Sequence, residues 1–215
     1  MMSVDSILAA GAPPIVAILR GITPAEAVAT AAALVEAGIR LIEVPFNSPD
    51  PAASIAAIQA EFGDRALIGG GTVVTADLVD QLAATGARLM VTPNTDPQLI
   101  ARGMGLGLEP MPGFVTPTEA FAAIAAGARH LKLFPASALA PGYARALVEV
   151  LPRDVRLWAV GGTGPDTLAQ WLSGPFAGIG VGGALYRPGQ PAATTRANAD
   201  ALVDAWRSAG FAPSR

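Results

Sequence analysis

The chain alternates short apolar runs with alanine-rich segments from one end to the other. Each apolar run has the length of a β-strand, and each alanine-rich segment is long enough for a helix. Strands that alternate with helices predict a parallel sheet with right-handed helical crossovers. The eight predicted strands are Ile15–Leu19, Leu41–Val44, Leu67–Gly70, Leu89–Val91, Gly107–Pro110, His130–Leu133, Leu157–Val160 and Gly178–Val181.

Helix boundaries are marked between these runs. Thr23-Pro24-Ala25-Glu26 and Thr116-Pro117-Thr118-Glu119 each have the pattern of a capping box with proline at the first helical position. Gly38, Gly86 and Gly127 each follow an alanine-rich segment, as expected for a glycine that ends a helix in the left-handed conformation. The chain therefore carries start and stop signals for several of its helices.

Eight strands is also the number that closes a TIM barrel, and 215 residues is near that fold's lower limit. We predict a single (β/α)8 TIM-barrel domain over residues 1–215, with a short N-terminal helix in 1–12. The barrel occupies 13–190 and a C-terminal helix 191–211. The alternative is an open doubly wound sheet, which usually carries an early glycine-rich nucleotide fingerprint. Leu19-Arg20-Gly21-Ile22 is not such a fingerprint.

Composition excludes several classes of function. A net charge of −3 without basic clusters argues against nucleic-acid binding. The absence of cysteine excludes disulfides, thiolate metal sites and cysteine catalysis. We find neither a signal-peptide pattern at the N-terminus nor an apolar stretch long enough to span a membrane. We expect a cytoplasmic protein, and because His, Asp and Glu do not cluster at metal-ligand spacing, we expect no metal.

A weak internal repeat places two charged residues at equivalent positions. Three segments contain glycine followed five residues later by Glu43, Val91 and Lys132 respectively. If each glycine ends a helix and the next strand starts in the same register, these three side chains share one height and one direction. A proline follows each within three residues, so each lies near the carboxyl end of its strand. Because TIM barrels hold their active sites at that end, Glu43 and Lys132 are predicted to face the same barrel mouth.

Lys132 is the only lysine, although the chain has 14 lysines and arginines together. A lysine amine can lose its proton and attack a carbonyl, whereas a guanidinium stays charged. The alternative is that a bias toward arginine codons left one lysine by chance. A carboxylate beside this amine fits either a structural ion pair or a catalytic pair. The position at the barrel mouth favours catalysis, since buried ion pairs add little stability.

Other candidate residues follow the ends of the first and third strands. Arg20 offers a fixed cation for a substrate carboxylate, or a salt bridge across the barrel mouth. Thr72 ends a run of three glycines that lets a ligand approach the backbone, although such a run is more often a turn.

The last two strands end in paired glycines, Gly161-Gly162 and Gly182-Gly183. In TIM barrels the corresponding loops form the usual phosphate site, so we predict phosphate binding there. His130, the sole histidine, lies near the opposite end of its strand. We interpret it as a structural residue of the lower barrel face.

Taken together, these segments resemble the 2-keto-3-deoxy-6-phosphogluconate (KDPG) aldolase family over nearly the whole chain. Individually several of the motifs are weak, but the combination is specific. The matching segments are Ala17-Ile18-Leu19-Arg20-Gly21-Ile22, Ile42-Glu43-Val44-Pro45-Phe46-Asn47-Ser48-Pro49, Gly70-Gly71-Thr72-Val73, Val91-Thr92-Pro93-Asn94, Leu131-Lys132-Leu133-Phe134-Pro135, Ala159-Val160-Gly161-Gly162 and Leu185-Tyr186-Arg187.

The resemblance implies a class I aldolase on a TIM barrel, commonly a homotrimer, with no metal and no cofactor beyond a covalent imine. It implies that Lys132 forms the imine and that Glu43 is the general acid and base. The remaining implied roles concern binding. Arg20, Thr72, Pro93 and Phe134 match the pyruvate pocket, and Gly161, Gly162, Gly182 and Gly183 match the phosphate loops.

Within the family, the chain is most similar to the 2-dehydro-3-deoxy-6-phosphogalactonate aldolases. Asn47 and Val160 follow the galactonate pattern, and these positions border the sugar C4 region. Relatives often have serine where this chain has Gly183, which removes a side-chain donor to phosphate. The implied reaction is reversible cleavage of the phosphogalactonate to pyruvate and D-glyceraldehyde 3-phosphate. The alternatives are KDPG or dual specificity and, more remotely, another phosphosugar barrel enzyme or a non-catalytic sugar-phosphate binder.

Overall fold

The computed structural model describes residues 2–140 and 142–210. Strands and helices alternate along this part of the chain. The strands are β1 (Ile15–Ile18), β2 (Leu41–Pro45), β3 (Leu67–Gly71), β4 (Leu89–Val91), β5 (Glu109–Met111), β6 (Gly113–Phe114), β7 (His130–Leu133), β8 (Arg156–Val160) and β9 (Phe176–Val181). The α-helices are α1 (Val4–Ala9), α2 (Pro24–Ala37), α3 (Pro51–Phe62), α4 (Ala76–Ala84), α5 (Pro97–Gly105), α6 (Pro117–Ala125), α7 (Tyr143–Val148), α8 (Pro165–Leu172) and α9 (Ala192–Ser208). A short 3₁₀ helix, η1, spans Ala136–Ala138.

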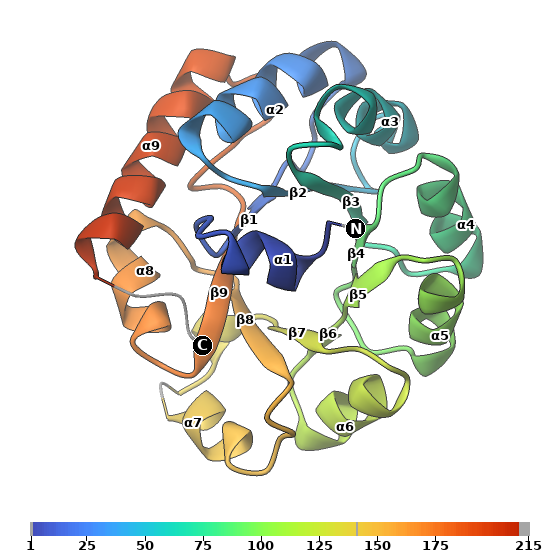
Figure 1. Ribbon diagram of the computed structural model, residues 1–215, viewed down its shortest axis with the longest axis vertical. Helices are drawn as coiled ribbons and strands as arrows, with labels where there is room; N and C mark the ends of the chain where they lie inside the picture. Colours follow the sequence, from blue (N-terminus) through green and yellow to red (C-terminus); the bar gives the residue numbers. More distant parts are fainter. Residues whose placement is uncertain (1, 141, 211–215) are drawn as a thin grey trace.

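The strands form one parallel sheet that curls into a barrel. Its order is β5-β4-β3-β2-β1-β9-β8-β7-β6, and Figure 1 shows the helices arranged around the ring of strands. β5 and β6 are two halves of one barrel position, separated by Pro112. The described chain therefore contains the eight predicted βα units, and the predicted TIM barrel is confirmed.

The fifth predicted strand, Gly107–Pro110, was misplaced. Gly107 has φ +78° and lies in the turn before the strand, and pairing begins only at Glu109. Pro110 and Pro112 have no backbone N–H to donate to a neighbouring strand. The strand is therefore interrupted, and its second half, Gly113–Phe114, pairs with β7.

The predicted helix boundaries are present. Thr23 and Thr116 form capping boxes with Glu26 and Glu119 at the starts of α2 and α6. Gly38, Gly86 and Gly127 have φ of +104°, +77° and +109° after α2, α4 and α6. The C-terminal helix ends at Ser208, and residue 211, the predicted end, lies outside the described residues.

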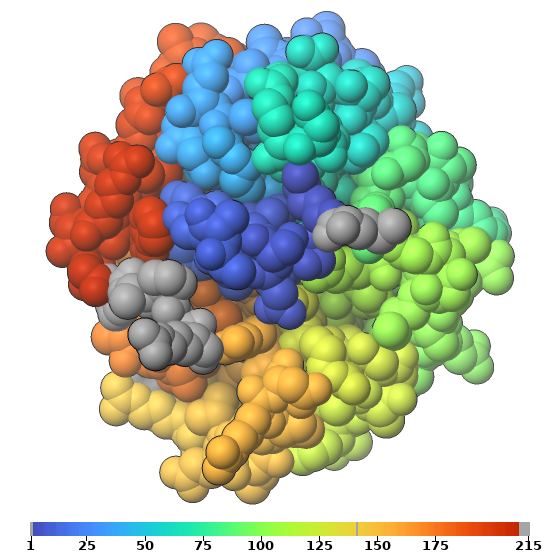
Figure 2. All heavy atoms as spheres, in the orientation of Figure 1, coloured from blue at the N-terminus to red at the C-terminus, as the bar shows by residue number. Residues whose placement is uncertain are grey.

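Two apolar clusters stabilise the fold. The larger one lies between the strands and the surrounding helices and includes Ile42, Leu131 and Ile179. The smaller one combines barrel-interior residues such as Trp158 with Val4 and Ile7 of α1. α1 therefore packs over one end of the barrel, as Figures 1 and 2 show. Residues that precede strands lie on this side, so it is the amino-terminal end of the barrel.

His130 is the buried member of a polar cluster at this end. Trp158 Nε1 donates a hydrogen bond of 3.2 Å to His130 Nδ1, and His130 Nε2 lies 3.6 Å from Asp5 Oδ1 and 3.7 Å from Glu109 Oε1. Glu109 in turn accepts a hydrogen bond of 3.0 Å from the Val4 N–H. These contacts attach α1 to the barrel and agree with a structural role for His130. Among the described helices, none is both long enough and apolar enough to cross a membrane.

Candidate active site

Lys132 lies in the middle of β7, where parallel pairing places it beside Gly113 of β6 and Trp158 of β8. The residue is only 7% exposed. Its Nζ lies 4.8 Å from the centre of the Phe134 ring, a distance at which an ammonium or a developing positive charge is attracted to the ring. The one lysine of the chain is therefore held inside the barrel beside an aromatic ring.

Glu43 approaches from the opposite wall. It belongs to β2, which lies four positions around the ring from β7 when β5 and β6 are counted as one. Glu43 is 2% exposed, and its Oε2 has no hydrogen-bond partner among the described residues. An unpaired buried carboxyl oxygen is costly to a fold and is rarely retained without a functional use.

Gly71 provides the space for this carboxyl. A carbon placed at the Cβ position of Gly71 would overlap the Glu43 carboxyl oxygens. The glycine run Gly69–Gly71 is strand backbone and not a turn, in agreement with the predicted strand Leu67–Gly70. Gly71 is the residue that sequence reasoning missed. Its role depends on the parallel register, which places Gly71 next to Pro45, two residues beyond Glu43, and which is not visible in the sequence alone.

Burial changes the protonation of both groups. It raises the pKa of Glu43 to about 7, while the positive charges of Lys132 and Arg20 act in the opposite direction. Burial lowers the pKa of Lys132 from its ordinary value; Glu43 opposes this change and Arg20 reinforces it. The sequence left open whether the apolar surroundings or Glu43 would dominate at Lys132. In the structure, burial has the larger effect and favours the neutral amine.

Arg20 follows β1 at the carboxyl end of the barrel. Its side chain is exposed, and its Nη1 donates a hydrogen bond of 2.5 Å to Asn47 Oδ1. The adjacent loops are joined a second time, because the Gly21 N–H donates to Ser48 Oγ at 2.9 Å. Asn47 therefore orients Arg20, and the two residues lie together just beyond Glu43.

Thr72 follows β3 in an unusual backbone conformation. Its φ is +57°, in the left-handed region that β-branched residues rarely adopt. Such strain costs on the order of 1–3 kcal/mol and concentrates at functional sites. Pro93 follows β4 and is half-buried, while Phe134 follows β7 and is 36% exposed. Thr72, Pro93 and Phe134 thus follow the carboxyl ends of strands that surround the barrel interior.

The paired glycines lie where β8 and β9 end. Gly161 and Gly162 have φ of +103° and +70°, a region that other residues adopt only with strain. Gly183 has no heavy atom within 4 Å of its Cβ position, so this loop is open. Val160, directly before the first pair, is buried and packs over Gly180 of β9. Each predicted site residue therefore lies at the carboxyl end of the barrel or in its interior just below.

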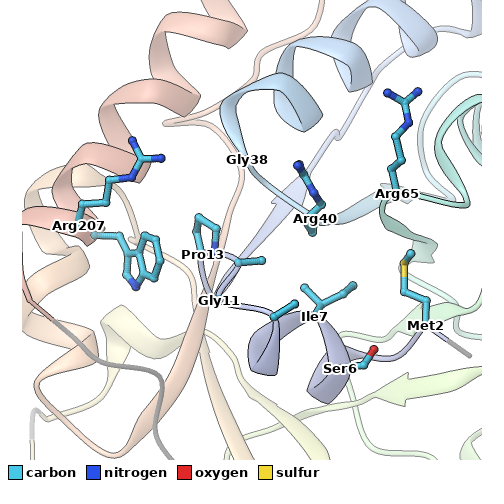
Figure 3. A pocket seen from close by; sticks show the side chains of 12 residues that line it. Met2, Ser6, Ile7, Gly11, Pro13, Gly38, Arg40, Arg65 and Arg207 are labelled. Carbon is cyan, nitrogen blue, oxygen red and sulfur yellow. The ribbon is translucent and has the colours of Figure 1, made fainter.

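A separate hollow of about 630 Å³ opens at the opposite end of the barrel. Figure 3 shows it between α1, Arg40, Arg65 and Arg207. None of the predicted site residues lines it. Within residues 2–140 and 142–210, three or more His, Asp or Glu side chains nowhere come together as a possible metal site.

This arrangement can perform amine chemistry on a carbonyl. A buried amine with a lowered pKa is a nucleophile, and a carboxyl with a pKa near neutrality both gives and accepts protons. The strained Thr72, the cation Arg20 and the open glycine loops surround them with groups suited to an acidic, phosphorylated ligand.

Comparison with known proteins agrees with this chemistry. The family model described as KDPG and KHG aldolase matches residues 4–196. A 2-dehydro-3-deoxy-6-phosphogalactonate aldolase of Escherichia coli (strain K12) is 50% identical over 91% of this chain and 96% of its own length. A 2-dehydro-3-deoxy-phosphogluconate aldolase of Treponema pallidum (strain Nichols) is 35% identical over 77% of this chain and 78% of its own length.

A solved structure described as native KDPGal superposes with a TM-score of 0.89 and 49% identity, covering 92% of this chain and 96% of the other. The family model, the Escherichia coli relative and the solved structure each match nearly the whole barrel. The chain therefore belongs to the KDPG and KHG aldolase family.

Proposed function

We propose that the protein is a class I aldolase that reversibly cleaves 2-dehydro-3-deoxy-6-phosphogalactonate to pyruvate and D-glyceraldehyde 3-phosphate. The observation that carries this proposal is a buried Lys132 amine and an unpaired, buried Glu43 carboxyl on strands that stand opposite each other in the barrel. The galactonate substrate is supported by the 50% identity to a relative named as a phosphogalactonate aldolase, compared with 35% to a relative named as a phosphogluconate aldolase.

The reaction begins when the neutral amine of Lys132 attacks the C2 carbonyl of the substrate. The resulting carbinolamine loses water, with Glu43 moving the protons, and leaves a positively charged iminium. Glu43 then accepts the C4 hydroxyl proton while the C3–C4 bond breaks, and the bonding electrons move toward the iminium nitrogen. Glyceraldehyde 3-phosphate leaves, and an enamine remains. A proton added at C3 gives the pyruvate imine, which water hydrolyses to pyruvate and free Lys132.

The protonation states suit this sequence. A carboxyl with a pKa of about 7 is present in both forms near neutral pH, so Glu43 serves as acid in one step and base in another. Burial lowers the pKa of Lys132 and increases the fraction that can attack. The protonated imine is positively charged, and the Phe134 ring, with its centre 4.8 Å from Nζ, stabilises that charge. The proposed chemistry therefore uses a covalent imine and no metal.

The binding roles follow from the order of groups around the mouth. We assign the substrate carboxylate and keto group to Arg20 and Thr72, with Pro93 and Phe134 as the apolar walls of the pyruvate pocket. We assign the phosphate to the free backbone of the two glycine loops, Gly161-Gly162 and Gly182-Gly183, which follow β8 and β9.

The assignment of C4 stereochemistry rests on Asn47 and Val160. Asn47 orients Arg20 through a hydrogen bond of 2.5 Å, and Val160 is an apolar group at the end of β8. An apolar side chain at this position offers no hydrogen bond to the C4 hydroxyl of the substrate. It therefore discriminates between the galactonate and gluconate configurations at C4.

The test is product formation from the phosphogalactonate and phosphogluconate substrates side by side, with pyruvate release followed by a coupled assay. We expect a higher kcat/KM for the galactonate substrate. Equal values would support dual specificity, and turnover of the gluconate substrate alone would contradict the assignment. Ligand binding without any product would indicate a sugar-phosphate sensor. Two further proposals accompany this function, namely assembly into a homotrimer, which the family resemblance implies, and residence in the cytoplasm.

A further inference from the structure

Ser137 lies beside the proposed phosphate loops but has no role assigned so far. It belongs to η1, the 3₁₀ turn of Ala136–Ala138 that follows β7 and therefore Lys132. The residue is exposed, and its hydroxyl forms no hydrogen bond within 3.5 Å to any described residue. A free hydroxyl at the mouth of the barrel is available to a ligand.

Gly162 and Ser137 are in direct contact. A carbon at the Cβ position of Gly162 would lie 2.6 Å from the Ser137 Cβ and 3.0 Å from its Oγ. Gly161 is similarly close to the start of η1, since a carbon at its Cβ position would lie 3.5 Å from the Ala136 nitrogen. The absence of side chains at Gly161 and Gly162 thus brings η1 against the loop after β8, with the Ser137 hydroxyl at the boundary.

The other hydroxyls in the loop after β8 are already engaged. Thr163 Oγ1 donates to the Gly180 carbonyl at 2.5 Å and is buried. Thr167 Oγ1 lies 3.3 Å from the Gly164 carbonyl and also accepts from the Gly164 N–H at 3.0 Å. In the loop after β9, Gly183 has no side chain, and the space around its Cβ position is empty to 4 Å. Tyr186 in the loop after β9 also has a hydroxyl without a partner, but this hydroxyl is buried. Among the described residues beside these loops, Ser137 therefore offers a free hydroxyl that is exposed.

We propose that Ser137 Oγ–H donates a hydrogen bond to the phosphate group of the substrate and contributes to selection of phosphorylated over unphosphorylated sugar acids. This inference rests on the proposed aldolase function and adds a side-chain donor to its phosphate site. A hydroxyl that donates to a doubly charged phosphate forms a charge-assisted hydrogen bond, which is stronger than a neutral one.

The test compares Ser137→Ala with the unchanged protein on 2-dehydro-3-deoxy-6-phosphogalactonate and on the same acid without phosphate. We expect KM for the phosphorylated substrate to rise about 10-fold or more, with little change for the unphosphorylated one. Borohydride trapping of pyruvate at Lys132 should be unaffected, since pyruvate has no phosphate. Ser173→Ala is the matched control, because Ser173 is an exposed serine at the end of α8 whose hydroxyl donates to the Gln170 carbonyl.

Equal kinetics of Ser137→Ala and the unchanged protein on the phosphorylated substrate would overturn the proposal. So would an equal loss on both substrates, which would indicate a structural role. If the unchanged protein cleaves neither substrate, the proposed function fails, and calorimetric titration with inorganic phosphate then decides the role of Ser137 by itself. Weaker phosphate binding by Ser137→Ala would support the proposal, whereas equal binding, or none in either protein, would refute it.

Discussion

Glu43 should reduce the stability of the protein at neutral and alkaline pH. Burial raises its pKa from 4.5 to about 7, so between these values the folded state binds more protons than the unfolded state. Stability attributable to Glu43 is therefore present below pH 4.5 and is lost as pH rises through about 7. At about 1.4 kcal/mol for each pH unit in this window, the ionised carboxyl costs about 3 kcal/mol.

Glu43→Gln removes this titration while keeping the shape of the side chain. Lys132 offsets part of the gain, because Glu43 favours its charged form. We therefore expect the difference in free energy of unfolding, Glu43→Gln minus unchanged protein, to grow by about 2–3 kcal/mol between pH 4.5 and 8.5. The measurement is urea denaturation at a series of pH values, with Glu149→Gln, an exposed glutamate at the end of α7, as the control.

If the free energies of unfolding of Glu43→Gln and the unchanged protein differ by the same amount at every pH, the reasoning is refuted. Such a result would mean that Glu43 has the same pKa in the folded and unfolded states. The same variant should lose turnover by roughly 10²–10⁴-fold, the usual contribution of a general acid and base. A gain in stability together with a loss of activity would show that the fold tolerates a destabilising carboxyl for the sake of the reaction.

Three further substitutions test neighbouring parts of the site and fold. Lys132→Arg keeps a positive charge but removes the attacking amine, so turnover should be abolished, and residual aldolase activity would contradict imine chemistry. Gly71→Ala should displace the Glu43 carboxyl and lower kcat roughly 100-fold, while pyruvate trapping persists; normal kcat would show that the carboxyl moves freely. Burial lowers the pKa of His130 from 6.5 to about 4, against the opposing charge of Asp5. The unfolded state therefore binds more protons in this window, and stability should fall as pH drops from 6.5 to about 4. His130→Gln should flatten that fall in urea denaturation, and an unchanged pH dependence would assign it to other groups.

Much of the fold could be predicted because its signals are local. The capping boxes at Thr23 and Thr116 and the glycines at Gly38 and Gly127 determine helix ends through a few neighbouring atoms. The strands between them have nearly the predicted bounds. The shared register of Glu43 and Lys132 also followed from local spacing, because helix ends and strand starts repeat at equal distances along the chain.

Features that depend on contacts between different strands and loops could not be predicted in the same way. The interruption of the fifth strand depends on how the segment with Pro110 and Pro112 pairs with β4 on one side and β7 on the other. From the sequence alone, the strand was predicted to begin two residues too early. The function of Gly71 depends on the position of the Glu43 carboxyl across a strand pair. The free hydroxyl of Ser137 likewise became visible only when η1 and the loop after β8 were placed together.

The most direct test of the account is to treat the protein with pyruvate and sodium borohydride and locate any adduct by peptide mass spectrometry. A buried amine whose pKa is lowered and whose iminium faces Glu43 should be captured as a reduced imine. We predict one pyruvate-derived adduct for each chain, on Lys132, with none in Lys132→Arg. An unmodified protein, or an adduct located only at the N-terminal amine, would contradict the central claim that Lys132 forms the imine.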